Sequence, residues 1–284
     1  MNYQDSKNMK DSKNQVNIPL DQENIQLAEK LMKIKHKIVI MSGKGGVGKS
    51  TISANLAISL ASRNRKVGIL DSDIHGPCIP SLLGVKNKRP EVSNNKIVPV
   101  SGPFNLKVVS IDFFLPDLSS PVIWRGPLKM RAIKQFLSDV EWETLDYLIV
   151  DLPPGTGDEP LSIMQLINDL DGIIMVTVPT DISQHVVRKA INMVKQFNIP
   201  IIGIIENMSG FFCPKCHEIY NILGAGGGES LAEEYKIPFL GKIPIDPLIA
   251  KSSDSGKSFL LENEDNICSK AFDLIINKII EIVE

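Results

Sequence analysis

A glycine-rich loop that follows a short apolar run carries the strongest chemical signal in the sequence. It matches the pattern G-x-x-x-x-G-K-[ST] and consists of Gly43, Lys44, Gly45, Gly46, Val47, Gly48, Lys49 and Ser50, followed by Thr51. Glycines allow such a loop to curl so that its backbone N–H groups face a polyanion, and the positive end of the following helix adds to the attraction. The pattern therefore predicts a site for nucleotide phosphates. A glycine-rich turn that only joins a strand to a helix is the structural alternative.

The side chains of this loop predict ATP and Mg²⁺ as cofactors. We expect Lys49 to reach the β- and γ-phosphates, Ser50 to ligate Mg²⁺ and Thr51 to hold the α-phosphate. Lys44 is a second lysine, in the first half of the loop. Phosphate binding does not require it, so the residues alone leave it as a solvated loop lysine or a residue with a separate role.

Acidic residues follow two further apolar runs, in "VGILDSD" and "YLIVDLPPGTGD". Ligands of open α/β sheets bind at the carboxyl ends of the strands, so these carboxylates should lie beside the loop. We expect Asp151 to hold Mg²⁺ through water, Asp71 to assist in the outer shell of the metal, and Asp73 to orient the attacking water. Asp158 fits a helix cap better. The "PPGTGD" stretch predicts a loop whose shape responds to the γ-phosphate.

Two cysteines, Cys213 and Cys216, form a CxxC pair in "GFFCPKCHEIY". Such a pair is a redox dithiol, half of a zinc site, half of an iron–sulfur site, or two inert thiols. A tetrahedral zinc site or a four-iron cluster needs four thiolates. Cys78 and Cys268 are isolated in apolar or helical settings typical of buried, unreactive thiols. A symmetric dimer would supply the missing pair across its axis.

The elements that must position these groups follow an α/β pattern. Short β-branched runs alternate with longer helical stretches, which predicts a mostly parallel, twisted sheet flanked by helices. The predicted strands span 38–42, 66–71, 107–111, 147–151, 172–178, 201–206 and 239–242. A polar turn within 89–100 predicts a hairpin beside the main sheet. A short amphipathic helix is predicted within 21–35, with Ile25, Ala28, Leu31 and Met32 at helical spacing.

The composition predicts a polar, disordered leader over residues 1–20 and a single ATPase domain over 21–284, with the CxxC segment near 213–216. The 284 residues are 43% hydrophobic and carry 31 basic against 33 acidic side chains. This near balance gives no general attraction to nucleic acid or acidic lipid. Four cysteines, no signal peptide and no apolar run of membrane length predict a cytoplasmic protein.

The loop sequence "KGGVGKS" resembles the deviant phosphate-binding loop of the MinD/ParA-like ATPases. That resemblance implies the P-loop NTPase fold. It also implies that Lys44 reaches across a homodimer to the nucleotide of the other subunit, where such a charge is worth about 10³ to 10⁵ in rate.

Longer stretches resemble the Mrp/ApbC family of iron–sulfur cluster carriers. The resemblance rests on "GKGGVGKST", "LDSDIHGPCIPSLLG", "WRGP", "DLPPGTGDEPLS", "IIENMSGFFCPKC" and "GAGGGESLAEE", and it covers most of residues 37–259. It implies a cytosolic homodimer whose paired CxxC motifs hold one bridging 4Fe-4S cluster, which passes to recipient apoproteins and involves cluster assembly proteins. Residues 1–35 contain no cysteine, so the additional N-terminal cluster of some eukaryotic relatives is not expected. Cys78 stands where many relatives carry serine.

The same resemblance implies contacts to the adenine base. Asn207, at the end of "IIGIIENMSG", would hydrogen-bond an adenine edge, and "IPIDP", with Pro244 and Asp246, would close over the ring. By its residue type alone, an asparagine after a strand is often only a turn residue.

Two alternative functions remain beside the cluster carrier. One is a positioning ATPase that binds membrane or DNA, but the C-terminal stretch carries Asp273, Glu281 and Glu284 and the sequence shows no basic stripe, so we expect no membrane or nucleic-acid partner. The other is an ATPase whose cysteines form a structural zinc clasp. Spacing alone leaves zinc and iron–sulfur nearly level, and the family resemblance favours the cluster.

Overall fold

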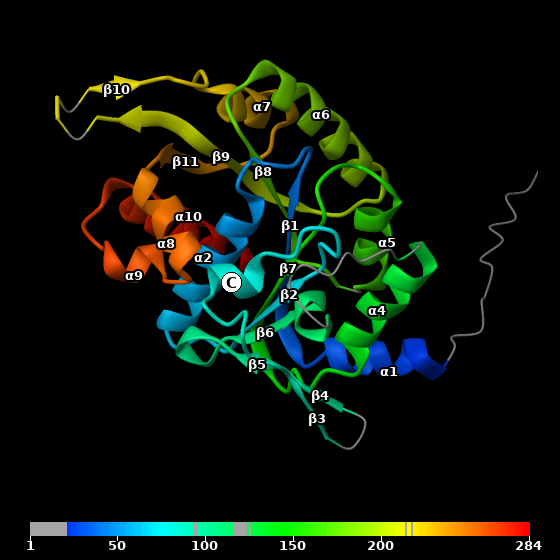
Figure 1. The fold of residues 1–284 in the computed structure, drawn as a ribbon. Helices are drawn as coiled ribbons and strands as arrows, with labels where there is room; N and C mark the ends of the chain where they lie inside the picture. Colours follow the sequence, from blue (N-terminus) through cyan, green and yellow to red (C-terminus); the bar gives the residue numbers. More distant parts are fainter. Residues whose placement is uncertain are drawn as a thin grey trace, which may run out of the picture.

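The computed structural model describes residues 22–93, 96–115, 124, 126–167, 169–213, 215–216 and 218–284. The polar leader predicted for residues 1–20 lies outside this part of the chain. Within it, a nine-stranded sheet has the order β10-β9-β8-β1-β7-β2-β6-β5, and β11 pairs with β9 (Figure 1). Its strands are β1 (Ile34–Ser42), β2 (Val67–Asp71), β5 (Val100–Ser101), β6 (Lys107–Ser110), β7 (Leu145–Asp151), β8 (Gly172–Thr177), β9 (Ile201–Phe212), β10 (Ile219–Tyr220) and β11 (Phe239–Ile245).

The central strands pair in parallel, and the short strands β5 and β10 pair antiparallel to β6 and β9. β2 and β8 are buried at every position, as parallel strands covered on both faces must be. The predicted α/β class with a mostly parallel sheet is therefore confirmed. The predicted hairpin is also present: β3 (Glu91–Ser93) and β4 (Lys96–Val98) form a separate two-stranded sheet.

Helices cover both faces of the sheet (Figure 1). One hydrophobic cluster packs α2, α3, α9 and α10 against the sheet, and a second packs α1, α4, α5, α6 and α7 against the opposite face. The helices are α1 (Gln22–Leu31), α2 (Lys49–Ser62), α3 (Ile79–Leu82), α4 (Gly126–Ser138), α5 (Asp158–Leu166), α6 (Asp181–Gln196), α7 (Gly227–Tyr235), α8 (Pro247–Ser255), α9 (Phe259–Glu262) and α10 (Ile267–Val283). None of the helices in the described ranges is long and apolar enough to cross a membrane.

Three sequence predictions were wrong in detail. β1 begins at Ile34, before the predicted strand, because the polar "KHK" stretch pairs with β7. β9 continues to Phe212 instead of ending at Glu206, because its last residues pair with β10 and β11. In the predicted helix, Leu31 is buried as its spacing predicts, but Ile25 is 43% exposed, and Met32 lies beyond the end of α1 and is 70% exposed. Leu27, which was not among the predicted positions, is buried.

Candidate functional site

The glycine-rich loop lies between the end of β1 and the start of α2, as the sequence predicts. Gly46 and Gly48 have positive φ angles of 76° and 82°, a region that favours glycine. A Cβ atom on Gly48 would lie 2.2 Å from Nδ2 of Asn207, so a larger residue there would have to displace the Asn207 side chain. The Ser42 hydroxyl donates a hydrogen bond to the carbonyl of Lys44 at 3.0 Å and so joins the end of β1 to the loop.

A pocket of about 370 Å³ opens over this loop. Its lining consists of Ser42, Lys44, Gly45, Gly46, Val47, Gly48, Lys49, Ser50, Thr51, Asp73, Gly76, Cys78, Leu82 and Pro154. The fold thus brings the predicted phosphate loop together with Asp73 after β2 and with the "PPGTGD" loop after β7. The Lys44 side chain has no hydrogen-bond or ion-pair partner within the described ranges, although it lines this pocket.

Asp151 is the polar centre of the site and is fully buried at the end of β7. Its Oδ2 lies 2.6 Å from Nζ of Lys49 and accepts a hydrogen bond from Oγ of Ser50 at 2.6 Å. Its Oδ1 accepts one from Oγ of Ser53 at 2.5 Å. Hydroxyl and carboxylate oxygens are the ligand types that Mg²⁺ prefers, so Ser50 and Asp151 fit the predicted metal site.

Ser53 is a site residue that the sequence prediction did not include. It lies four residues after Lys49 on α2, so both side chains face Asp151 from the same side of the helix. The four-residue spacing between Lys49 and Ser53 could have identified Ser53 from the sequence, because it places the Ser53 hydroxyl on the helix face that holds the Asp151 carboxylate.

Asp71 is fully buried beside Asp151, because β2 and β7 pair with these two residues in register. Burial and, secondarily, the neighbouring Asp151 carboxylate raise the pKa of Asp71 to about 8. Its oxygens accept hydrogen bonds from the backbone N–H groups of Asp73 and Ile79 and from the Ser110 hydroxyl. The structure thus places Asp71 next to the predicted metal ligand, while protein donors occupy its own oxygens.

The three residues assigned to adenine lie near one another, but none of them lines the phosphate pocket. Asn207 is only 8% exposed, and its Nδ2 donates to the carbonyl of Val47 in the loop at 2.9 Å. Pro244 follows Ile243, which pairs with Asn207 across β11 and β9. Asp246 caps α8, since it accepts from the Leu248 N–H at 2.8 Å and from Nδ2 of Asn266 at 2.7 Å.

The CxxC pair lies where β9 turns into β10, on a hairpin that projects from the sheet (Figure 1). Cys213 is half-buried and Cys216 is exposed, and both are free thiols. The backbone of Cys213 donates to the Glu218 carbonyl at 3.0 Å and closes the turn. A backbone hydrogen bond at Glu218, followed by hydrogen bonds with Cys213 and Tyr220, holds the pKa of Cys216 below its ordinary value. This favours the thiolate, which is the form that binds metals.

No group of three or more histidine, cysteine and acidic side chains able to hold a metal ion occurs among the residues that the structure describes. His217, which follows Cys216 in the sequence, lies outside them. Of the other cysteines, Cys268 is buried, and burial raises its pKa to about 12. Cys78 is half-buried on the wall of the phosphate pocket, and burial raises its pKa to about 11. Neither thiol lies on the CxxC hairpin.

A second residue missed from sequence is Glu206, which is fully buried in β9. Its carboxylate accepts hydrogen bonds from the Ser209 hydroxyl and from the backbone N–H groups of Gly226 and Gly228. It therefore ties the outer half of β9 to the N-terminus of α7, where a negative charge is favoured.

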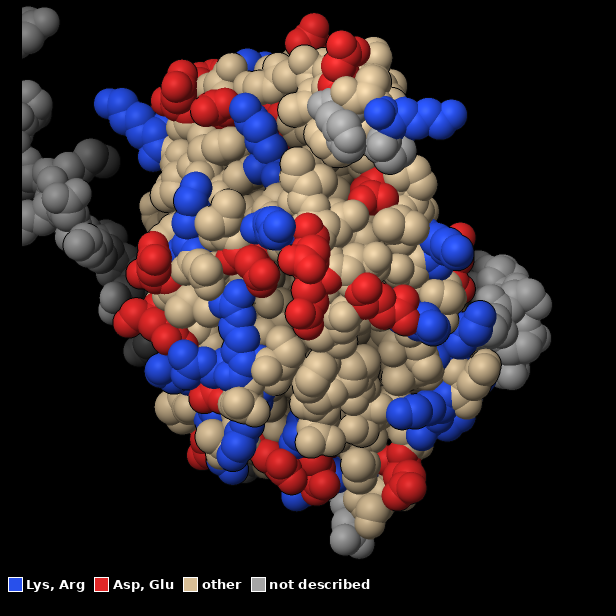
Figure 2. Space-filling model, turned by 90° about the vertical axis from the view of Figure 1, so that its left-hand side faces the viewer, with Lys and Arg blue, Asp and Glu red and all other residues tan. Residues whose placement is uncertain are grey.

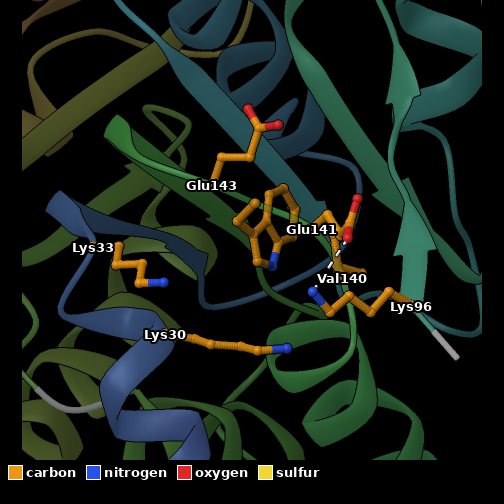
Figure 3. Close-up of a pocket in the computed structure, with 7 residues that line it drawn as sticks. Lys30, Lys33, Lys96, Val140, Glu141 and Glu143 are labelled. Atoms are coloured by element: carbon orange, nitrogen blue, oxygen red, sulfur yellow. Dashed lines mark ion pairs between the residues drawn. The ribbon is translucent and has the colours of Figure 1, made fainter. Parts of the chain in front are cut away.

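A smaller hollow of about 220 Å³ lies away from this site (Figure 3). Lys30, Lys33 and Lys96 line it together with Glu141 and Glu143, and Lys96 pairs with Glu141 at 3.4 Å. None of the predicted site residues lies there. Basic and acidic side chains are likewise interspersed on the face of the molecule in Figure 2, which shows no continuous basic stripe.

Comparison with known proteins agrees with these features. Residues 33–280 match the model of the ParA group described as NUBPL iron-transfer P-loop NTPase. The chain is 52% identical to an iron-sulfur cluster carrier protein of Methanocaldococcus jannaschii, over 93% of this chain and 91% of that protein. It is 49% identical to a protein of the same name from Saccharolobus solfataricus, over 95% and 91%.

A solved structure shares both fold and sequence with this chain. It is a nucleotide-binding protein from Archaeoglobus fulgidus in complex with ADP, and the two are 42% identical with a TM-score of 0.74. The match covers 83% of this chain and 92% of that one.

Proposed function

This chain belongs to the ParA group of NUBPL iron-transfer P-loop NTPases, and from that membership we propose that it is an ATP-hydrolysing iron–sulfur cluster carrier. In this proposal the cluster is cargo. Two copies hold it at their paired Cys213 and Cys216 thiolates, and it passes to recipient apoproteins, with cluster assembly proteins as further partners.

One observation carries the proposal: strand β9 connects the nucleotide loop to the cysteine hairpin. Asn207 in this strand hydrogen-bonds to Val47 of the loop, and Cys213 follows the end of the same strand. In this proposal, a change in the loop moves Asn207, and the movement reaches Cys213, six positions further along the same backbone. This proximity supports coupling between nucleotide and cluster better than it supports two independent sites.

The residues of the pocket have complementary roles in the proposed hydrolysis. Lys49 holds the β- and γ-phosphates, Thr51 holds the α-phosphate, and Asp73 orients the attacking water. Ser50 and Asp151 would hold Mg²⁺, which when bound neutralises charge on the transferred phosphate. Asp71, which pairs in register with Asp151 on the neighbouring strand, would assist in the outer shell of the metal.

A homodimer is the assembly that completes both sites. A 4Fe-4S cluster requires four thiolates, and the CxxC hairpin of one copy offers two. Lys44 lines the pocket without a partner inside the described ranges, as expected of a residue that acts on the nucleotide of a second copy. The two observations come from different parts of the chain and are satisfied by one two-fold axis.

The remaining assignments follow from the same proposal. Asn207 would hydrogen-bond an adenine edge, and Pro244 and Asp246 would close over the ring, where Asp246 also caps α8. Residues 21–284 would form one domain, because both hydrophobic clusters pack on a single sheet. A reducing cytoplasm would keep the four cysteines as thiols.

Anaerobic reconstitution with iron and sulfide tests the cluster assignment. We expect about four irons per dimer, with the absorbance of an iron–sulfur cluster and little zinc in protein purified without oxygen. The Cys213→Ala, Cys216→Ala double variant should lose this iron, whereas the buried control Cys268→Ala should keep it. Equal iron in the double variant and the wild type would refute the proposal, and stoichiometric zinc without iron would favour a structural clasp.

A further inference from the structure

A buried lysine on α4 joins the two segments that flank the nucleotide pocket. Lys129 is only 7% exposed. Its ammonium contacts Nε2 of His75, in the segment after β2, and a carboxylate oxygen of Glu159, in the first turn of α5. Three elements distant in sequence therefore meet at one charged group.

The chemistry of these contacts fixes the direction of the hydrogen bond. A lysine ammonium only donates hydrogen bonds, so Nε2 of His75 accepts one from Lys129. The Glu159 carboxylate supplies the opposite charge that a buried ammonium requires.

Packing alone does not require a lysine at this position. The neighbouring buried residues of α4 are Ala132, Ile133, Phe136 and Leu137, which form an ordinary apolar face. Replacing a buried ion pair by an apolar residue of similar volume is often neutral or stabilising. We therefore look for a role of the Lys129 charge other than stabilising the fold.

Both partners of Lys129 lead directly to the pocket. His75 lies between Asp73 and Gly76, which line the pocket and hydrogen-bond to each other at 3.1 Å. Glu159 lies in the first turn of α5, directly after the loop that follows Asp151, and Pro154 of that loop also lines the pocket. Lys129 thus connects the two loops without itself lining the pocket.

We propose that Lys129 is a positioning residue that holds these two loops in one mutual arrangement, so that the water held by Asp73 and the loop after β7 reach their hydrolytic geometry together. This inference rests on the proposed ATP hydrolysis. Lys129 does not touch the phosphate pocket itself, so its loss should lower turnover without weakening nucleotide binding. Small misplacements of such groups lower rates by up to about 10²-fold.

Steady-state ATP hydrolysis by the full chain tests this, using Lys129→Met, Lys129→Arg and Glu159→Gln. We expect Lys129→Met to lower kcat by about 10- to 100-fold with KM for ATP within about twofold of wild type. Arginine retains the charge and several donors, so Lys129→Arg should recover part of the loss. Glu159→Gln removes one side of the bridge without changing its shape and should lower kcat in the same way.

The matched control is Lys134→Met, on the same helix, where the lysine pairs with the exposed Glu23. It should behave as wild type. Wild-type kcat in both Lys129→Met and Glu159→Gln would overturn the inference while leaving ATP hydrolysis intact. A rise in KM for ATP that accompanies the fall in kcat, and that Lys129→Arg does not rescue, would also overturn it. A wild-type protein that hydrolyses no ATP would instead remove the proposed function itself. If Lys129→Met does not fold, the other two variants decide.

Discussion

At the scale of single residues, the site is organised around Asp151. Lys49, Ser50 and Ser53, all on α2, hold its two oxygens, so the helix that begins at the phosphate loop also fixes the carboxylate orientation. Lys49 and Asp151 are both buried, and their charges attract each other more strongly there than they would in water. The arrangement shows how the helix that follows the glycine-rich loop holds the Asp151 carboxylate on the neighbouring strand, where we propose that Mg²⁺ binds.

Asp71 makes the stability of the Mg²⁺-free protein depend on pH. Its pKa rises from an ordinary 3.8 to about 8 in the folded protein, because the carboxyl is buried beside Asp151. The folded state then keeps a proton that the unfolded state releases, so this contribution to stability is fully present below about pH 3.8 and is lost as the pH rises through about 8.

Urea unfolding at pH 6 and pH 9 in EDTA checks this prediction. The loss of unfolding free energy between these pH values should be smaller in Asp71→Asn than in the wild type. The exposed control Asp273→Asn should keep the wild-type difference. An identical pH dependence in Asp71→Asn and wild type would contradict a raised pKa.

At the scale of elements, β9 is the strand that connects the glycine-rich loop to the CxxC hairpin. The strand is long, and left-handed residues interrupt it at Met208 and Gly210, with φ angles of 54° and 79°. Glu206 precedes this irregular part and accepts two hydrogen bonds from the N-terminus of α7 and one from Ser209 within β9. One buried carboxylate therefore joins the irregular part of β9 to α7.

Glu206→Gln should loosen this anchor. A carboxamide has one acceptor oxygen, so its NH₂ group would face at least one of the donors that the carboxylate now accepts from. Leaving a buried donor unsatisfied costs about 1–3 kcal/mol, and we expect a comparable loss in the free energy of unfolding, together with faster loss of iron from the reconstituted protein. Thermal unfolding and iron retention measure both effects.

The control for this variant is Glu229→Gln, an exposed residue of α7 that pairs with Lys242. It should change stability by less than about 0.5 kcal/mol. If Glu206→Gln were as stable as this control and held iron equally long, β9 would not depend on Glu206.

The elements also show what sequence can predict. Buried parallel strands and the phosphate loop have strong local patterns, so their existence and order were predicted correctly, although β1 begins four residues earlier than predicted. The outer half of β9 was missed because Met208 and Gly210 break the strand pattern. Pairing with β10 and β11 keeps these residues in the strand, and a local sequence pattern does not reveal that pairing. The sequence did not indicate the roles of Lys129 and Glu206, because all of their side-chain partners except Ser209 lie at least 20 residues away along the chain.

At the scale of the whole molecule, the proposed dimer brings together properties that one copy lacks. The phosphate pocket has a lysine without a partner in the described part of the chain, and the hairpin has two thiols where a cluster needs four. One two-fold assembly would complete both sites. The central claim is thus that each copy completes the sites of the other.

Mixed dimers of Lys44→Ala and Lys49→Ala test that claim most directly. Each variant alone should hydrolyse ATP about 10³-fold or more slowly than wild type, since one lacks the trans charge and the other the phosphate-binding lysine. In a mixed dimer, the Lys44→Ala copy keeps its own Lys49 and receives Lys44 from its partner, so its pocket is complete.

We therefore predict that mixing the two inactive variants restores a substantial part of the wild-type hydrolysis rate, in proportion to the fraction of mixed dimers. Lys33→Ala, at the hollow remote from the site, serves as the active control. A mixture no more active than either variant alone, with mixed dimers demonstrated by mass, would contradict the account.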